Sequence, residues 1–154
     1  MRIALNGAFW GSDTTGSGQY LMALLPEMVR QAPDDAFDLL LPAPLATPGG
    51  STPPPWGIHR VAGPFDGRNE DLAKVWFEQV AYPRFCRRLG ADVAHVPYFA
   101  PPLASSVPVV VTIHDLIPMV LPENRGDARF RLYIRLVAAA ARRAALVLTD
   151  SRAS

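Results

Sequence analysis

The residues best placed to do chemistry are His114 and Asp115, which directly follow the run Val109–Ile113. Imidazole titrates near neutral pH and can donate a hydrogen bond or accept a proton. The run before the pair consists of β-branched residues between Pro108 and Pro118, which predicts a strand buried on both faces, as in a parallel sheet. Ligands bind beyond the carboxyl ends of such strands, so the pattern predicts a ligand site here. The alternative is a structural histidine followed by a turn-forming aspartate.

A second candidate is the glycine-containing stretch Gly16-Ser17-Gly18, which precedes a predicted helix. Backbone amides at a helix N-terminus bind phosphate or carboxylate groups, and glycine lets a ligand approach closely. The stretch departs from a dinucleotide-binding fingerprint, because Leu21 takes the third glycine position and the predicted strand 37–41 ends without an acidic residue. No Gly-Lys-Ser/Thr occurs, which excludes a P-loop. A flexible loop with an ordinary glycine cap is the other interpretation.

The remaining histidines and the single cysteine are predicted to be structural. His59 and His95 are not placed at the end of a buried strand, and Cys86 falls in an amphipathic helix, where a small buried apolar role is typical. The three histidines belong to different elements, and neither His-Glu-x-x-His nor paired cysteines occur. We therefore predict no protein-bound metal.

These candidates are positioned by strands that alternate with helices along the whole chain. The alternation, with several strands apolar throughout, predicts an α/β fold with a doubly wound, mostly parallel sheet of Rossmann type and strand order 3-2-1-4-5-6. We expect one domain over residues 1–154, a part of a longer protein, because a covering helix should follow the last strand. The predicted strands are 2–6, 37–41, 58–61, 92–96, 109–113 and 146–149, and the predicted helices are 19–30, 70–89 with a kink at Pro83 and a stop at Gly90, and 128–145.

Composition excludes several classes of protein. The chain is 49% hydrophobic with a formal net charge of +1, which favours a globular protein over a disordered or nucleic-acid-binding one. One cysteine and the absence of a signal-peptide pattern predict a cytoplasmic location. Basic residues alternate with aromatic ones around Lys74 to Arg88, and arginines recur along the last helix, including Arg131, Arg135 and Arg142. Peripheral membrane contact and an ordinary solvated or packed helix both explain these patterns.

Three stretches, taken in order, resemble one family. They are Thr15-Gly-Ser-Gly-Gln-Tyr20 after the first strand, Asp92 to Pro102 with Val109 to Pro118, and Ala141 to Ser151. Together they are similar to the N-terminal domain of retaining group 1 glycosyltransferases, the family 4 enzymes of GT-B fold. Pro97 to Phe99 and Pro122-Glu123 resemble mannosyltransferase-like members most closely.

The resemblance implies transfer of a sugar from a nucleotide-diphosphate sugar to a glycan or lipid-linked acceptor in a cleft between two domains, without a cofactor. It implies that Gly16, Ser17 and Gly18 line the cleft near the donor diphosphate and that His114 lies beside the transferred sugar. The acceptor-side candidates are Asp115, Tyr98 and Ser151. The C-terminal domain that holds the nucleotide in this family is absent from the sequence, so we expect little activity from this chain alone.

Other interpretations remain open at this point. A dinucleotide-dependent oxidoreductase is disfavoured by Leu21 and by Leu39 to Leu41. A stand-alone binding or assembly module would use the basic helix and the aromatic patches. Exposure of a surface that normally meets a second domain would also favour a homodimer of this chain.

Overall fold

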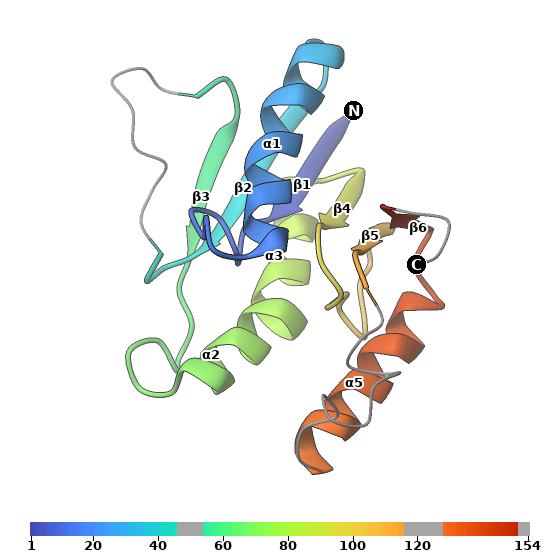
Figure 1. The fold of residues 1–154 in the computed structure, drawn as a ribbon. Coiled ribbons are helices and arrows are strands. Elements are labelled where there is room, and N and C mark those ends of the chain that lie inside the picture. The colour runs from blue at the N-terminus through green and yellow to red at the C-terminus, as the bar shows by residue number, and fades with distance from the viewer. Residues whose placement is uncertain (46–53, 116–127, 151–154) are drawn as a thin grey trace.

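A computed structural model describes residues 1–45, 54–115 and 128–150 (Figure 1). Six strands form one sheet in the order β3-β2-β1-β4-β5-β6, and every neighbouring pair is parallel. This confirms the predicted fold class and strand order. The strands are β1 (Arg2–Asn6), β2 (Ala36–Pro42), β3 (Gly57–Val61), β4 (Val93–Val96), β5 (Val109–Ile113) and β6 (Leu146–Thr149), each within one residue of its predicted bounds at either end.

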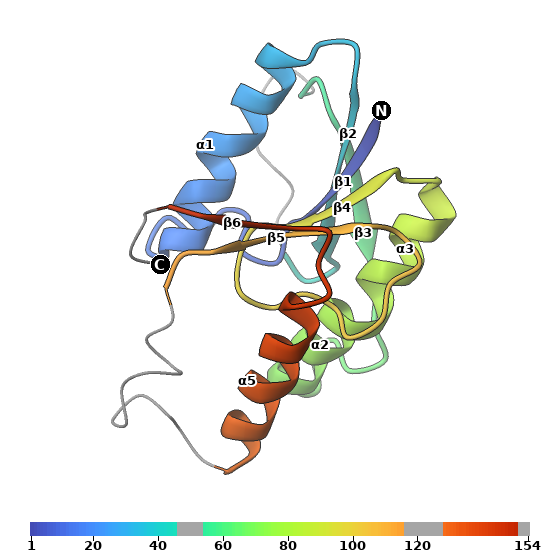
Figure 2. The same cartoon turned by 90° about the vertical axis from the view of Figure 1, so that its right-hand side faces the viewer.

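Helices cover both faces of the sheet (Figure 2). Helix α1 (Gly16–Gln31) packs on one face through Leu21 and Leu25, which meet alternate residues of β1 and β2. Helices α2 (Glu70–Trp76) and α3 (Tyr82–Leu89) and helix α5 (Ala128–Ala141) lie on the other face. The doubly wound arrangement follows because strands buried on both faces need a helical layer on each side.

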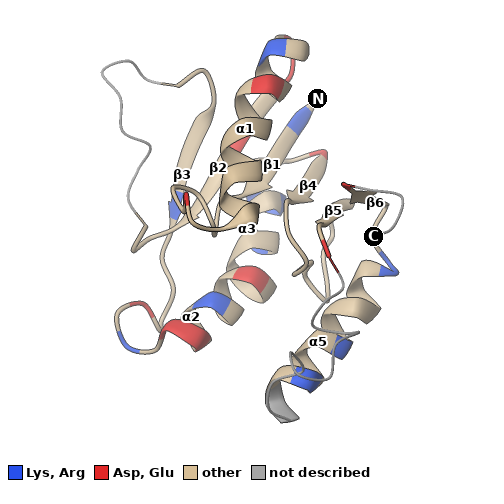
Figure 3. Cartoon of the chain, viewed as in Figure 1, with Lys and Arg blue, Asp and Glu red and all other residues tan. Residues whose placement is uncertain are grey.

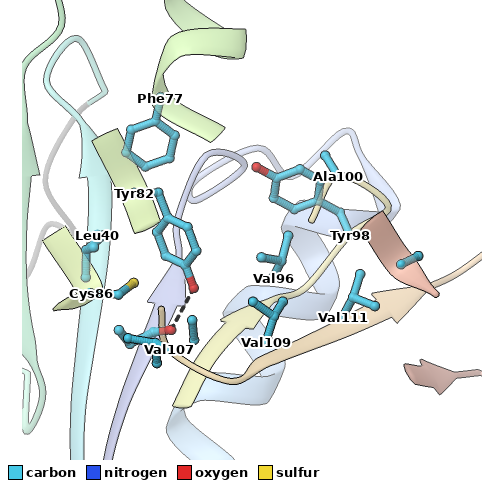
Figure 4. Close-up of a cluster of buried hydrophobic side chains, with 13 residues drawn as sticks. Leu40, Phe77, Tyr82, Cys86, Val96, Tyr98, Ala100, Val107, Val109 and Val111 are labelled. Atoms are coloured by element: carbon cyan, nitrogen blue, oxygen red, sulfur yellow. Dashed lines mark hydrogen bonds between the residues drawn. The ribbon is translucent and has the colours of Figure 1, made fainter. Parts of the chain in front are cut away.

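The core on the α2–α3 side is larger and is centred on Tyr82 (Figure 4). Its side chain is 0% exposed, and its hydroxyl donates to the carbonyls of Ala4 at 2.9 Å and His95 at 3.0 Å. Since those carbonyls belong to β1 and β4, one phenol ties α3 to the two strands at the centre of the sheet. Val96, Val109 and Val111 complete the strand side of this core.

The predicted helix 70–89 is continuous but contains a π-helical turn, η1 (Phe77–Ala81), between α2 and α3. Proline has no N–H and its ring crowds the carbonyl four residues earlier, so Pro83 cannot join a regular α-helical ladder. The wider turn directly upstream takes up this misfit, with the Tyr82 amide donating to the Phe77 carbonyl. The expected kink at Pro83 is thus a local π-helical turn, and Gly90 ends the helix at φ 65° as predicted.

The last predicted helix is shorter than expected, because α5 ends at Ala141 and not at residue 145. Ile134, Val137 and Ala141 face the core, but Phe130, which the helical spacing puts on the same apolar face, is 39% exposed. The Ala145 amide already donates to the Val109 carbonyl at 2.8 Å, so the chain enters the sheet at that point. The chain therefore leaves the helix and pairs with β5 before Leu146.

Candidate active site

The candidate site is built around His114 at the carboxyl edge of the sheet. Strands β5 and β6 run parallel with Ile113 opposite Thr149, so the next residue of each strand, His114 and Asp150, meet at the same edge. Nδ1 of His114 lies 2.6 Å from a carboxylate oxygen of Asp150. The His114 side chain is 20% exposed and that of Asp150 is 48% exposed, so the pair is open to solvent.

The second ring nitrogen of His114 is also held. Nε2 lies 3.1 Å from the carbonyl oxygen of Pro97, in the loop after β4. A carbonyl only accepts hydrogen bonds, so Nε2 is the donor in this contact, and a carboxylate oxygen of Asp150 lies at Nδ1. With an acceptor on each nitrogen, His114 is arranged as a hydrogen-bond donor and not as a base.

Tyr20, the fifth residue of α1, contacts the histidine of this pair. The ring of Tyr20 meets the His114 imidazole edge to face, with ring centres 4.8 Å apart and planes at 75°. This contact places Tyr20, two residues after Gly18, against the predicted histidine.

Gly16, Ser17 and Gly18 form the first turn of α1, not the loop before it. Thr15 caps the helix, and its hydroxyl accepts the Gly18 amide at 3.2 Å. A Cβ atom at Gly18 would lie 2.0 Å from the Ser12 carbonyl oxygen, whereas one at Gly16 would meet nothing within 4 Å. Gly18 is therefore needed for packing. The amides of Gly16 and Ser17 have no carbonyl partner within the helix, as is general for a first turn, and they suit an anion.

Tyr98 does not line an open surface. Its side chain is 5% exposed, and its hydroxyl donates to Oδ1 of Asn6 at 3.0 Å. Burial, and after it the nearby Glu78 carboxylate, raises the pKa of Tyr98 well above its usual value. Tyr98 therefore has a structural role and not the predicted acceptor-side role, because a ligand cannot reach its hydroxyl in this arrangement. Nδ2 of Asn6 is buried and has no hydrogen-bond partner among the residues described.

The other predicted residues have separate locations. Asp115 is exposed next to His114, and Ser151 lies outside the described residues, as does Pro122-Glu123. His95 is buried against the Thr112 hydroxyl at 3.1 Å, and His59 lies 2.7 Å from Asp38, so both make the structural contacts expected of them. Burial raises the pKa of the Cys86 thiol to about 12, which fits an inert core residue. Within the described residues, no group of three or more potential metal ligands occurs.

The basic and aromatic segment around α2 and α3 is mainly a packed helix. Phe77 and Tyr82 are 3% and 0% exposed, so these two aromatic side chains lie in the core and the interpretation as a membrane patch is wrong for them. Trp76 and Phe85 are partly buried. Arg84, Arg87 and Arg88 of α3 and Arg131 and Arg135 of α5 are exposed, as in a solvated helix face. Figure 3 marks the basic residues of both helices in blue. None of the described helices is both long enough and apolar enough to cross a membrane.

Two open hollows lie near the amino ends of β5 and β6, away from His114. They have volumes of about 530 and 410 Å³ and share the loop residues 104–106. None of the predicted site residues lines either hollow. Neither of these two hollows is therefore part of the site at His114.

Comparison with protein families identifies the family of this chain. The family described as Glycosyltransferase Family 4 matches residues 15–154, which spans the glycine turn, His114 and Asp150. The chain belongs to glycosyltransferase family 4. None of the curated proteins compared with the chain matches it. Membership in family 4 gives no support to the oxidoreductase alternative.

Asp150 and Tyr20 are the site residues that the sequence interpretation missed. Asp150 directly follows a predicted strand, as His114 does. Once these strands are placed as parallel neighbours, the two residues must meet. Tyr20 and Leu24 are apolar residues at helical spacing, and nothing in the sequence distinguishes such a residue from one of the core.

Proposed function

We propose that this family 4 domain contributes the acceptor side of a retaining sugar transfer from a nucleotide-diphosphate sugar. The observation that carries the proposal is the joint placement of the first turn of α1 and the His114–Asp150 pair at one sheet edge. In this proposal residues 1–154 are one domain, and a second domain holds the nucleotide. The chain alone is then expected to transfer sugar poorly or not at all.

In this proposal His114 acts as a donor to the transferred sugar. Asp150 orients the ring through Nδ1, and the Nε2–H group, which donates to the Pro97 carbonyl here, would donate instead to the oxygen of a sugar hydroxyl. A preorganised donor of this kind stabilises the transition state without reorganisation at the moment of reaction. Asp115 and Ser151 are the remaining acceptor-side candidates by their positions after β5 and β6.

The donor diphosphate is proposed to approach the amides of Gly16 and Ser17. The positive end of the helix and its unpaired N–H groups favour negative charge at this point. Gly18 contributes indirectly, since its lack of a side chain lets the loop at Ser12 pack against the turn.

The finer assignments are proposals as well. The acceptor is a glycan or a lipid-linked sugar, the transferred sugar is a hexose and in particular mannose, and no cofactor is required. The location is the cytoplasm, with peripheral contact at the inner face of the membrane. A homodimer of this chain stays a prediction, and sedimentation at high concentration would test it.

The test is sugar transfer by the full-length enzyme, followed with nucleotide-diphosphate sugars. We expect His114→Ala to lower turnover by roughly ten-fold or more, since an aligned donor contributes that much or more to a transition state. Asp150→Asn, which keeps the side-chain shape, is expected to lower turnover less. Both variants should keep the far-ultraviolet circular dichroism spectrum of the parent enzyme.

The matched control is His59→Ala. His59 is also a partly exposed histidine at 2.7 Å from an aspartate, but it lies on β3 at the opposite end of the strand order. Turnover of His59→Ala should stay close to that of the parent enzyme. Near-parental turnover of His114→Ala would remove His114 from the proposed site.

A further inference from the structure

The loop that holds His114 is itself attached to the π-helical turn η1. Nε2 of His114 donates to the carbonyl of Pro97, the first residue of loop 97–108. Farther along that loop, Oε1 of Gln79 accepts the Leu103 amide at 2.9 Å, and Nε2 of Gln79 donates to the Pro101 carbonyl at 3.4 Å. One side chain of η1 therefore fixes the loop at two backbone positions.

The preceding residue of η1, Glu78, reaches the same loop from inside the protein. Its side chain is 0% exposed, and its two carboxylate oxygens lie 2.7 Å from Nζ of Lys74 and 2.6 Å from the Tyr133 hydroxyl, which donates to it. A buried carboxylate is retained only where such partners compensate the loss of water. Glu78 thereby joins α2 to α5 at the point where Tyr98 of the loop is packed.

Tyr98 transmits this anchoring to the carbonyl that His114 uses. Tyr98 follows Pro97 directly, and its side chain lies within the large core (Figure 4). The Glu78 charge acts on its hydroxyl, that hydroxyl is held by Asn6, and the Lys74 ammonium lies 5.9 Å from its ring centre. With Tyr98 fixed from several sides, the Pro97 carbonyl has little freedom to leave Nε2 of His114.

We propose that Glu78 and Gln79 are positioning residues that set the orientation of His114 through loop 97–108. π-Helical turns are rare and occur frequently at functional sites, which agrees with this one carrying both residues. The importance of the orientation for catalysis rests on the proposed sugar transfer. The contact itself is a property of this chain and can be measured without any substrate.

The experiment is nuclear magnetic resonance of the histidine rings in the full chain, which contains three histidines. The rate at which the Nε2 proton of His114 exchanges with water reports how well the Pro97 carbonyl holds it. We expect Gln79→Ala and Glu78→Gln each to raise that rate roughly five-fold, the effect of weakening one hydrogen bond. The rates at His59 and His95, which have other partners, should not change.

Gln31→Ala is the matched control. The Gln31 side-chain amide also donates a hydrogen bond, to Glu27, but it lies at the C-terminal end of α1. It should leave all three rates unchanged. If the Glu78 variant does not fold, the Gln79 variant decides the question alone. A folded Gln79→Ala with an unchanged His114 rate, or with equal increases at all three histidines, would overturn the proposal. Sugar transfer is not measured, so failure here and failure of the proposed function are distinguishable.

Discussion

Substituting the two glycines of the first turn of α1 should have opposite effects on stability. A Cβ at Gly18 would lie 2.0 Å from the Ser12 carbonyl oxygen and 2.8 Å from that of Phe9, and both are backbone atoms. The Ser12 amide itself donates to the Phe9 carbonyl at 3.1 Å, so the two obstacles belong to one turn and must move together. Gly16 has open space in the same helix.

The magnitude for Gly18→Ala follows from two opposing effects. Overpacking against atoms that cannot rotate away costs up to about 3 kcal/mol. Alanine in place of glycine favours a helix by about 1 kcal/mol. The free energy of unfolding should therefore fall by about 2 kcal/mol, which corresponds to a Tm lower by roughly 4–8 °C for a chain of this size. Gly16→Ala has only the second effect and should be neutral or stabilising by up to about 1 kcal/mol.

Thermal and urea denaturation of the two variants, followed by circular dichroism, measures this difference. Equal stability of Gly18→Ala and Gly16→Ala would refute the packing role of Gly18. It would also return Gly18 to the group of residues whose glycine is explained by a ligand. The comparison thus separates, within three residues, a glycine required by the fold from one available to a substrate.

Three further predictions concern single residues. Burial lowers the pKa of His95 to about 4, so between pH 6.5 and 4 the unfolded chain binds a proton that the folded chain does not. The free energy of unfolding should therefore fall by about 2 kcal/mol from pH 7 to 5. The fall should be smaller in the variant His95→Gln. An equal fall in that variant would contradict this. Tyr82→Phe leaves two strand carbonyls without their phenol donor and should cost about 1–2 kcal/mol in urea denaturation, whereas unchanged stability would show that the bonds contribute nothing net. Gly16→Pro removes one backbone N–H at the first helical position, which accepts proline because Thr15 before it is extended. The variant should bind a nucleotide-diphosphate sugar roughly ten-fold more weakly at unchanged Tm. Unchanged affinity would show that the Gly16 amide does not bind the diphosphate.

Most of the fold was predictable because its strands are short, apolar and separated by clear turns. Val109–Ile113 is buried from both sides, and this is the property that its uninterrupted β-branched composition encodes. Helix ends were less predictable. Gly16 and Gly18 suggested a loop, yet the Thr15 cap starts the helix at Gly16, since a cap hydroxyl compensates for poor intrinsic helix formers.

The candidate site was predictable only in part, for a reason specific to sheet edges. His114 stands out in the sequence because it ends an apolar run, whereas Asp150 follows an ordinary Leu146–Thr149 strand and becomes visible only through its register with β5. The role of Tyr98 depends on distant partners, Asn6 and Glu78, that no local pattern connects to it. Contacts between elements far apart in the chain are what the sequence pattern leaves open.

The geometry of His114 also restricts which chemistry this domain can supply. A general base needs an unprotonated nitrogen directed at the substrate, and here each nitrogen faces an oxygen that accepts a proton or a hydrogen bond. To become a base at Nε2, His114 would have to lose its contact with Pro97, because Nε2 donates a hydrogen bond to that carbonyl. A sugar hydroxyl that takes the place of the Pro97 carbonyl requires only an exchange of acceptors. The His114 site is therefore better suited to holding a sugar by a donated hydrogen bond than to removing a proton from an acceptor.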